Sequence, residues 1–65
     1  MGPRLTTSKY TVIYFSTVSE RWQIAGWSSL HDHCERYIAW IPGILQRAMI
    51  VDADAAEPMV ALLNG

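Results

Sequence analysis

Cysteine and charged residues are scarce in this sequence. Cys34 is the single cysteine, so the chain can form no internal disulfide, and we expect a reducing, cytoplasmic environment. Five basic and six acidic side chains among 65 residues give a formal net charge of -1. The basic residues are scattered and form no stripe that could follow a phosphate backbone. We therefore expect no nucleic-acid partner.

Long apolar runs and glycine-rich loops are absent as well. The most apolar stretch, residues 37–51, is shorter than the roughly 20 residues of a membrane-spanning helix, and Pro42, Gly43 and Arg47 interrupt it. Residues 1–8 lack the apolar segment of a secretory signal. The four glycines are isolated and build no phosphate-binding loop. We expect no membrane association and no cofactor.

Apolar residues, in contrast, are plentiful for so short a chain. They make up 51% of the sequence, which is too many for a disordered chain and many for a small body with a large surface. Residues 1–8 are mostly polar and show no periodicity, so we expect a flexible leader there, followed by a single domain over residues 9–65. Part of the apolar surface is expected to meet another chain.

Two segments near the start have the composition of β-strands. Residues 9–17, KYTVIYFST, are rich in β-branched and aromatic side chains, and residues 21–27, RWQIAGW, follow after a short polar turn. This spacing predicts an antiparallel hairpin with a loop of about three to five residues. Gly26 interrupts the second strand, which predicts a β-bulge or the close approach of another backbone segment.

The next segment has helical periodicity. Ser28 or Ser29 is expected to open the helix, because Ser29 and Asp32 have the spacing of a capping box. Pro42 and Gly43 are expected to end it. Apolar side chains recur at intervals of three and four residues and form one stripe, made of Leu30, Cys34, Tyr37, Ile38 and Ile41.

The last third of the chain leaves two alternatives open. Residues 46–52 favour a third strand because Ile50 and Val51 are β-branched, although the periodicity also allows a helix. In the tail, capping-box spacing and a final Asn-Gly favour a short helix, whereas Pro58 leaves an edge strand possible. The predicted fold class is a small single-domain α+β fold of order ββαβ, an antiparallel hairpin followed by a helix and a third strand, with a short C-terminal helix or edge strand.

Residues 28–35, SSLHDHCE, resemble a metal or catalytic site when they are read as a string. On a helix, however, His31 and His33 stand about 160 degrees apart and cannot bind one ion together. His31 can reach only Cys34 or Glu35, three and four residues further on. Cys34 lies within the apolar stripe, which predicts burial instead of reactivity. We expect no metal site, no catalytic residue and no enzymatic activity.

Both faces of the predicted hairpin are apolar. Short helices can cover one face of a small sheet, so the other face is expected to meet solvent or a second subunit. This argument predicts a homodimer or a dedicated protein partner. The alternation places Tyr10, Val12 and Tyr14 opposite to Thr11, Ile13 and Phe15 on the first strand, and Trp22 and Ile24 opposite to Ala25 and Trp27 on the second.

Aromatic side chains and one histidine are the best candidates for a binding surface, namely Tyr10, Tyr14, Trp22, Trp27, His33 and Trp40. The predicted function is that of a non-enzymatic protein-interaction module, a candidate regulator or inhibitor, which acts on a protein partner or as a homodimer through the sheet and the helix end. The alternative is a dimer that binds a small apolar or aromatic ligand between its sheets. His33, near Tyr37 and Trp40 on the predicted helix, is expected to make association sensitive to pH.

Overall fold

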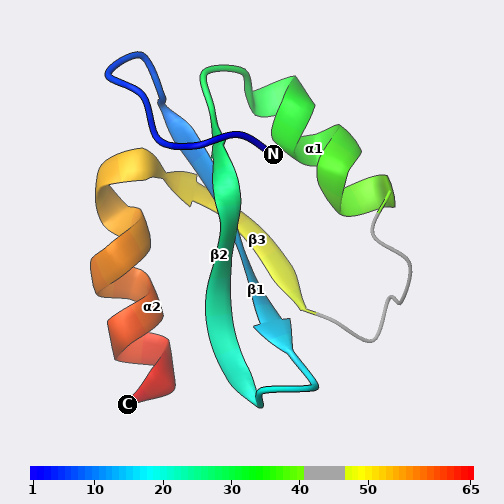
Figure 1. The fold of residues 1–65 in the computed structure, drawn as a ribbon, viewed down its shortest axis with the longest axis vertical. Coiled ribbons are helices and arrows are strands. Elements are labelled where there is room, and N and C mark those ends of the chain that lie inside the picture. The colour runs from blue at the N-terminus through cyan, green and yellow to red at the C-terminus, as the bar shows by residue number, and fades with distance from the viewer. Residues whose placement is uncertain (41–46) are drawn as a thin grey trace.

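The computed structural model describes residues 1–40 and 47–65. Three strands and two helices confirm the predicted α+β fold of order ββαβ, and the tail is a helix (Figure 1). In chain order the elements are β1 (Tyr10–Ser16), β2 (Arg21–Ser28), α1 (His31–Trp40), β3 (Ala48–Asp52), a 3-10 turn (Ala53–Ala55) and α2 (Ala56–Asn64). The predicted helix end at Ile41, Pro42 and Gly43 lies outside the described residues.

The strands form one sheet in the order β2-β1-β3. β1 pairs antiparallel with both of its neighbours, so β2 and β3 run in the same direction on either side of it. Strands that run in the same direction need a crossover connection, and α1 lies on that connection. The third strand that the β-branched residues predicted is therefore an edge of the sheet.

The two helices lie on opposite faces of the sheet, as Figure 1 shows. α1 packs across all three strands, and the ring of His31 meets the edge of Tyr10. α2 packs over β2 and β1, where Ile24 and Val60 line a common cleft. The expectation that one sheet face would lack a helix is therefore wrong. Because α1, on the crossover connection, covers one face of the sheet, α2 packs against the apolar side chains of the other face.

A β-bulge in β2 changes the distribution of the tryptophans. The register shifts between Val12 and Ile13, so that Thr11 pairs with Trp27 whereas Ile13 pairs with Ile24. Directly paired residues share a face, and Trp27 consequently lies on the same face as Ile24. The expectation that Trp27 would lie opposite to Trp22 and Ile24 is wrong. One extra residue in a strand moves every side chain beyond it to the other face.

Gly26 fulfils both roles that its position predicted. It lies at the bulge with a φ of 155 degrees, which L side chains rarely adopt. A Cβ atom at Gly26 would stand 2.5 Å from the Cβ of Met1 and 3.0 Å from the carbonyl oxygen of Gly2. The N-terminal segment passes over this point, and the Trp27 N–H donates to the Gly2 carbonyl at 3.1 Å. Flexibility of residues 1–8 stays a prediction, but the segment has a defined docking site.

The fully buried core is small. It consists of a few side chains in the middle of the sheet and where the helices meet it, namely Val12, Ile13, Cys34, Ala53 and Ala56, together with Thr11. The hydroxyl of Thr11 donates to the Gly26 carbonyl, so this buried polar group is paired. Most other apolar side chains are half-buried or exposed.

Both helices begin differently from the predicted capping boxes. The Leu30 carbonyl accepts from the Cys34 N–H, so Leu30 caps α1, and its side chain is 63% exposed instead of continuing the apolar stripe. Ser28, not Ser29, supplies the side-chain oxygen, which accepts from the Leu30 N–H. At α2, Ala55 is the cap and no side chain caps it. Pro58 lies in the first turn of α2. A backbone N–H at this position would have no acceptor within the helix, so proline breaks no helical hydrogen bond.

Candidate interaction surface

The reactive residues at the start of α1 separate as the helical geometry predicted. Nδ1 of His31 lies 3.1 Å from Oε1 of Glu35, and Nδ1 of His33 lies 3.1 Å from Oγ of Ser28. Cys34 is completely buried between them, and this burial raises the pKa of its thiol above the ordinary value of 9.0. Within residues 1–40 and 47–65, no three histidine, cysteine or acidic residues are grouped so that they could hold a metal ion.

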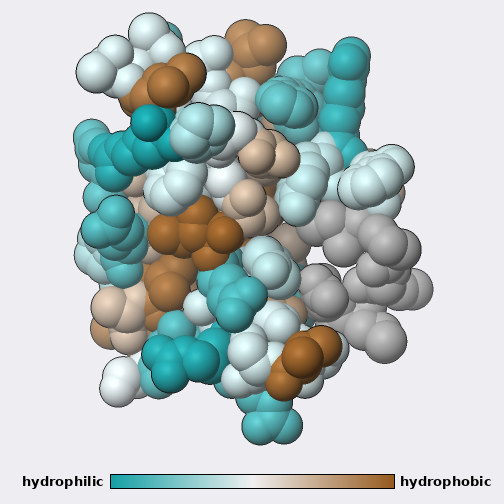
Figure 2. Space-filling view, in the orientation of Figure 1, coloured by the Kyte–Doolittle hydropathy of each residue, from teal (hydrophilic) through white to brown (hydrophobic). Residues whose placement is uncertain are grey.

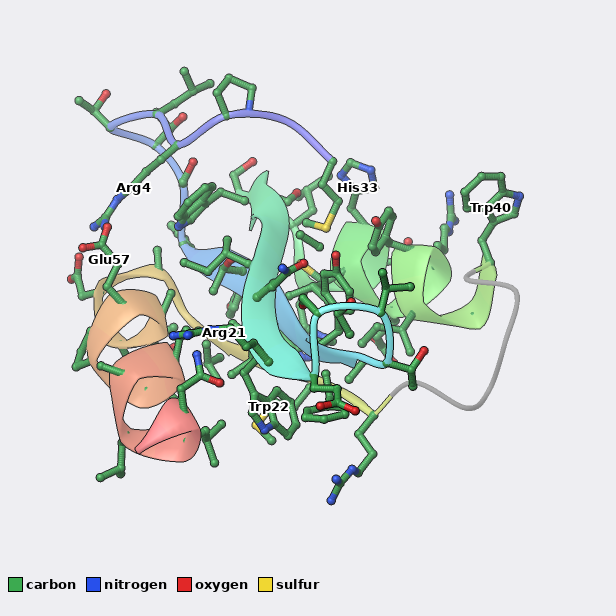
Figure 3. All side chains as sticks on the ribbon, turned by 60° about the horizontal axis from the view of Figure 1, so that its bottom comes forward. Arg4, Arg21, Trp22, His33, Trp40 and Glu57 are labelled. Carbon is green, nitrogen blue, oxygen red and sulfur yellow. The ribbon has the colours of Figure 1, made fainter. Side chains whose placement is uncertain are left out.

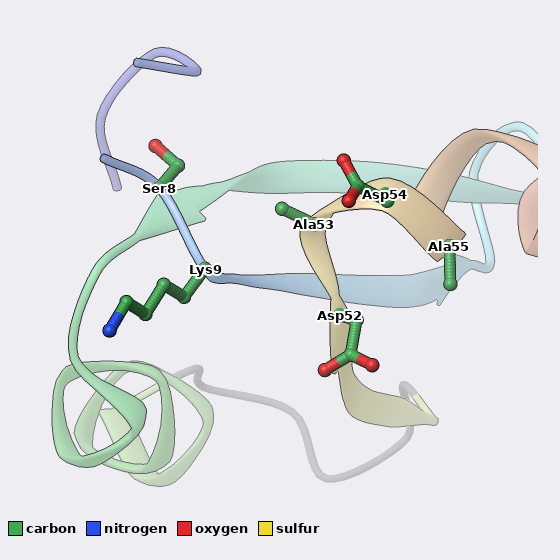
Figure 4. Close-up of a pocket in the computed structure, with 6 residues that line it drawn as sticks. All are labelled: Ser8, Lys9, Asp52, Ala53, Asp54 and Ala55. Carbon is green, nitrogen blue, oxygen red and sulfur yellow. The ribbon is translucent and has the colours of Figure 1, made fainter. Parts of the chain in front are cut away.

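A shallow pocket of about 440 Å³ follows the end of β3. It is lined by Ser8, Lys9 and the turn Asp52 to Ala55. Figure 4 shows that the carboxylates of Asp52 and Asp54 point to different sides of this turn, while Lys9 extends away from both. Asp54 instead accepts from Arg4 at 2.6 Å. The pocket therefore brings no charged groups together on a ligand.

The structure places the six side chains predicted as a binding surface on both faces of the sheet and along α1. Tyr10 and Tyr14 are half-buried on the face that α1 covers, and the Tyr14 hydroxyl donates to Oε1 of Gln23 at 3.0 Å. His33 and Trp40 lie toward opposite ends of α1 (Figure 3), and Trp40 is 77% exposed. Trp22 and Trp27 lie on the other face of the sheet, and Trp27 is half-buried.

Trp27 is a structural residue more than a surface residue. Its indole Nε1 is buried and has no hydrogen-bond partner among the described residues. A buried donor without a partner costs about 1–3 kcal/mol, so the site is tolerated for its apolar packing and not for a polar contact. The N-terminal segment also crosses the backbone of this residue, through the bond between Trp27 and Gly2.

Trp22 is anchored at the other end of β2. Its backbone N–H donates to Oδ1 of Asn64 at 2.7 Å, and its carbonyl accepts from Nδ2 of Asn64 at 3.1 Å. The amide of Asn64 thus replaces a neighbouring strand and fixes the end of α2 to the sheet. The Trp22 ring meets the edge of Phe15, and the guanidinium of Arg47 lies over both rings at 6.0 and 5.3 Å from their centres. This cluster faces the same side of the sheet as α2.

Helix α2 carries apolar side chains far beyond the part that packs on the sheet. At about 100 degrees per residue, its apolar arc runs from the sheet contact at Val60 past Leu63 and Met59 to Leu62. Glu57 and Ala61 border the cleft at β2, so this arc extends along the opposite flank of α2. Leu62 is 77% exposed and Leu63 is 39% exposed.

The sheet continues this apolar area, because α2 covers β2 and β1 and leaves β3 open on the same face. Met49, which pairs with Ile13, is 37% exposed there. We name the whole area the α2-side surface, and its residues are Phe15, Trp22, Met49, Met59, Leu62 and Leu63. Only Trp22 was among the predicted candidates. The sequence shows that the tail carries apolar residues. It does not show that the sheet, with a third strand of only five residues, leaves some of these side chains exposed.

A second hollow lies on the other flank of α2, along the outer edge of β2. Figure 2 views the molecule from this edge and shows apolar atoms gathered between α2 and β2, with hydrophilic atoms above and below. The hollow has a volume of about 560 Å³. Arg21 and Glu57 lie at its rim, and Ile24 and Val60 form its apolar part. It is open and shallow beside the broad α2-side surface.

No protein-family model, curated protein or solved structure matches this chain. Neither of the two helices in the described part of the chain has the length and apolarity needed to span a membrane.

Proposed function

We propose that this chain is a non-catalytic protein-interaction module, a candidate regulator or inhibitor, that binds its partner through the α2-side surface. The observation that supports this function is the exposure of Leu62 at 77%, on the same side of the sheet as the partly exposed Leu63 and Met49. Several large apolar side chains that are exposed side by side mark an interaction site more often than chance exposure does. A reducing, cytoplasmic location belongs to the same proposal.

The energetics favour an apolar contact over an electrostatic one. Covering an exposed leucine removes apolar area from water and stabilises a complex by about 1.5–3 kcal/mol per side chain. Leu62, at 77% exposure, can therefore carry a large part of the free energy of binding, and Leu63, at 39%, a smaller part. Trp22 and Phe15 extend the surface with rigid aromatic rings, which are common anchors of protein interfaces.

The chemistry of the chain also supports a binding role. The histidines at the start of α1 are engaged with Glu35 and Ser28, and the only thiol is buried. The side chains of the α2-side surface are apolar except for neighbouring Arg47, so nothing on it can donate or accept a proton near neutral pH. A surface of this composition binds and does not catalyse.

The test compares matched charge insertions. Leu62→Glu places a carboxylate at the most exposed side chain of the α2-side surface, whereas Val18→Glu places one at a 93% exposed apolar residue in the hairpin loop. Both sites are solvent-exposed, so both variants are expected to fold. Proteins from the native host are captured on each variant and quantified by mass spectrometry, and the affinity for a captured protein is then measured with purified components.

We expect Leu62→Glu to weaken binding of the purified partner at least tenfold and Val18→Glu to leave it unchanged. Equal binding by Leu62→Glu and by the unmodified chain would contradict the proposal. The absence of any protein that binds the purified chain directly would contradict it as well.

A further inference from the structure

The outer edge of β3 presents backbone groups in a regular pattern, and no residue of the described part of the chain bonds to them. The Phe15 N–H donates to the Arg47 carbonyl at 2.7 Å, and the Ala53 N–H donates to the Lys9 carbonyl at 2.9 Å. In an antiparallel ladder alternate residues bond to the same neighbour. Arg47, Met49, Val51 and Ala53 thus bond toward β1, whereas Ala48, Ile50 and Asp52 direct their backbone groups to the outer edge.

At the opposite edge of the sheet, formed by β2, other segments of the chain bond to the outward backbone groups. Along β2, the Trp27 N–H is bonded to Gly2 and the backbone of Trp22 is bonded to Asn64. The two terminal segments therefore cover both ends of that edge. None of the residues 1–40 and 47–65 bonds to the outer edge of β3 in this way.

β3 also lacks the usual devices that prevent edge pairing. Its sequence, AMIVD, contains no proline and no lysine, and its pairing with β1 has no bulge. Its single charge, Asp52, lies at the last residue. An exposed edge of this composition is a template for another strand.

We propose that the outer edge of β3 pairs antiparallel with β3 of a second copy of this chain, with the two-fold axis at Ile50. This register overlaps the whole strand. It places Ile50 opposite Ile50 of the second copy and Ala48 opposite Asp52 of the second copy. A register centred on Met49 would place Asp52 opposite residue 46, beyond the end of β3.

The available groups match in this register. The N–H and carbonyl of Ile50 exchange two hydrogen bonds across the axis. The Asp52 carbonyl begins the 3-10 turn, which leaves its N–H to donate to the Ala48 carbonyl of the other copy, once in each direction. The pairing thus satisfies both outward groups of Ile50 at the centre of β3 and adds one hydrogen bond at each of its ends.

The apolar side chains of β3 agree with the same partner. On the face of α2, Met49 lies opposite Val51 of the second copy, so apolar side chains meet on both sides of the axis. Arg47 and Asp52 lie on opposite faces of the sheet, so the pairing depends on backbone hydrogen bonds and apolar side chains and not on this pair of charges. The result is a six-stranded sheet in which the two α2-side surfaces become continuous. This dimer does not depend on the function proposed above, because its hydrogen bonds come from the backbone of β3, whereas the proposed partner contact is tested at Leu62 on α2, which lies over β2 and β1.

The backbone conformation of Asp52 allows a sharp test. Its φ of -63 degrees is that of proline, and its N–H points away from β1, so Asp52→Pro fits the monomer. The same substitution removes the donor to Ala48 and places a ring at the seam between the copies. Asp52→Ala is the matched control, since it removes the carboxylate and keeps the N–H.

Sedimentation equilibrium is measured for all three chains from about 1 to 200 μM. We expect dimers of the unmodified chain and of Asp52→Ala, and a dissociation constant at least tenfold higher for Asp52→Pro with an unchanged circular dichroism spectrum. A monomeric unmodified chain at 200 μM would overturn the proposal, and so would equal dimerisation of the alanine and proline variants.

Amide hydrogen exchange tests the register without any substitution. The N–H groups of Ile50 and Asp52 are expected to gain protection as the protein concentration rises, whereas those of Met49 and Val51 are protected at every concentration. Concentration-independent exchange at Ile50 would overturn the β3 seam, even if the chain dimerises elsewhere. Leu62→Glu is expected to leave the dimer intact, so failure of the seam and failure of the α2-side surface are separate results.

Discussion

Gly26→Ala adds only one methyl group, but we expect it to lower the stability of the fold strongly. At a φ of 155 degrees, an alanine is held in a region that is nearly exclusive to glycine, at a cost of about 1–3 kcal/mol. The new methyl group would also stand 2.5 Å from the Cβ of Met1, so the N-terminal segment has to move. Its movement breaks the hydrogen bond from Trp27 to Gly2, which contributes about 1 kcal/mol.

The two contributions together predict a loss of about 2–4 kcal/mol, which is most of the stability that a core of this size supplies. Urea unfolding followed by tryptophan fluorescence measures it. With a slope near 1 kcal/mol per molar urea, the midpoint is expected to fall by roughly 2–4 M.

A shortened chain separates the two contributions. When residues 1–4 are removed, the methyl group meets no leader, and Gly26→Ala should then cost only the backbone strain, about 1 kcal/mol less than in the full chain. An equal cost in both chains would refute the close approach of the leader. A loss below about 0.5 kcal/mol in the full chain would refute the strained conformation as well.

Three further substitutions test other parts of the fold. Glu20 has a φ of 56 degrees in the hairpin loop, so Glu20→Gly should raise the free energy of unfolding by about 0.5–1 kcal/mol in urea titrations. Asn64→Asp keeps the acceptor for the Trp22 N–H and loses the donor to its carbonyl, so it should cost about 1 kcal/mol, and Asn64→Ala about twice as much. For Cys34, the raised pKa means that its contribution is complete below pH 9.0 and is lost as the pH rises above that value, because the unfolded chain ionises first. Cys34→Ala should therefore flatten the alkaline decline of the melting temperature.

The elements of the fold could be predicted because they depend on local signals. The β-branched run of β1, the periodicity of α1 and the Asn-Gly stop of α2 are each written within about ten residues. Even the bulge at Gly26 has a local signal. The helix starts were less certain because Leu30 and Ala55 act as caps without a side-chain oxygen, which no capping pattern indicates.

The candidate surface depends on long-range arrangement and was therefore missed in large part. Whether Leu62 is buried or exposed is decided by the face on which α2 packs and by how far that face extends past β1. The face of Trp27 is decided by one bulged residue. Residue type identified five aromatic side chains and one histidine that could bind a partner. These six side chains lie in separate places, because the sheet has two faces and α1 has two ends.

The contrast between the two sheet edges links the termini of the chain to its assembly. Gly2 and Asn64 lie near opposite ends of the sequence, yet both bond to outward-facing groups of β2. Each of these bonds stabilises the fold by about 1 kcal/mol, and together they also occupy both ends of the template that an unpaired strand offers to other chains. If β3 pairs with β3 of a second copy, as proposed above, the two-fold operation uses the open edge of both copies, so pairing stops after one addition. A chain with two open edges would extend into a fibre, whereas the proposed pairing of β3 would end in a dimer, because other segments of the chain cover both ends of each outer β2 edge.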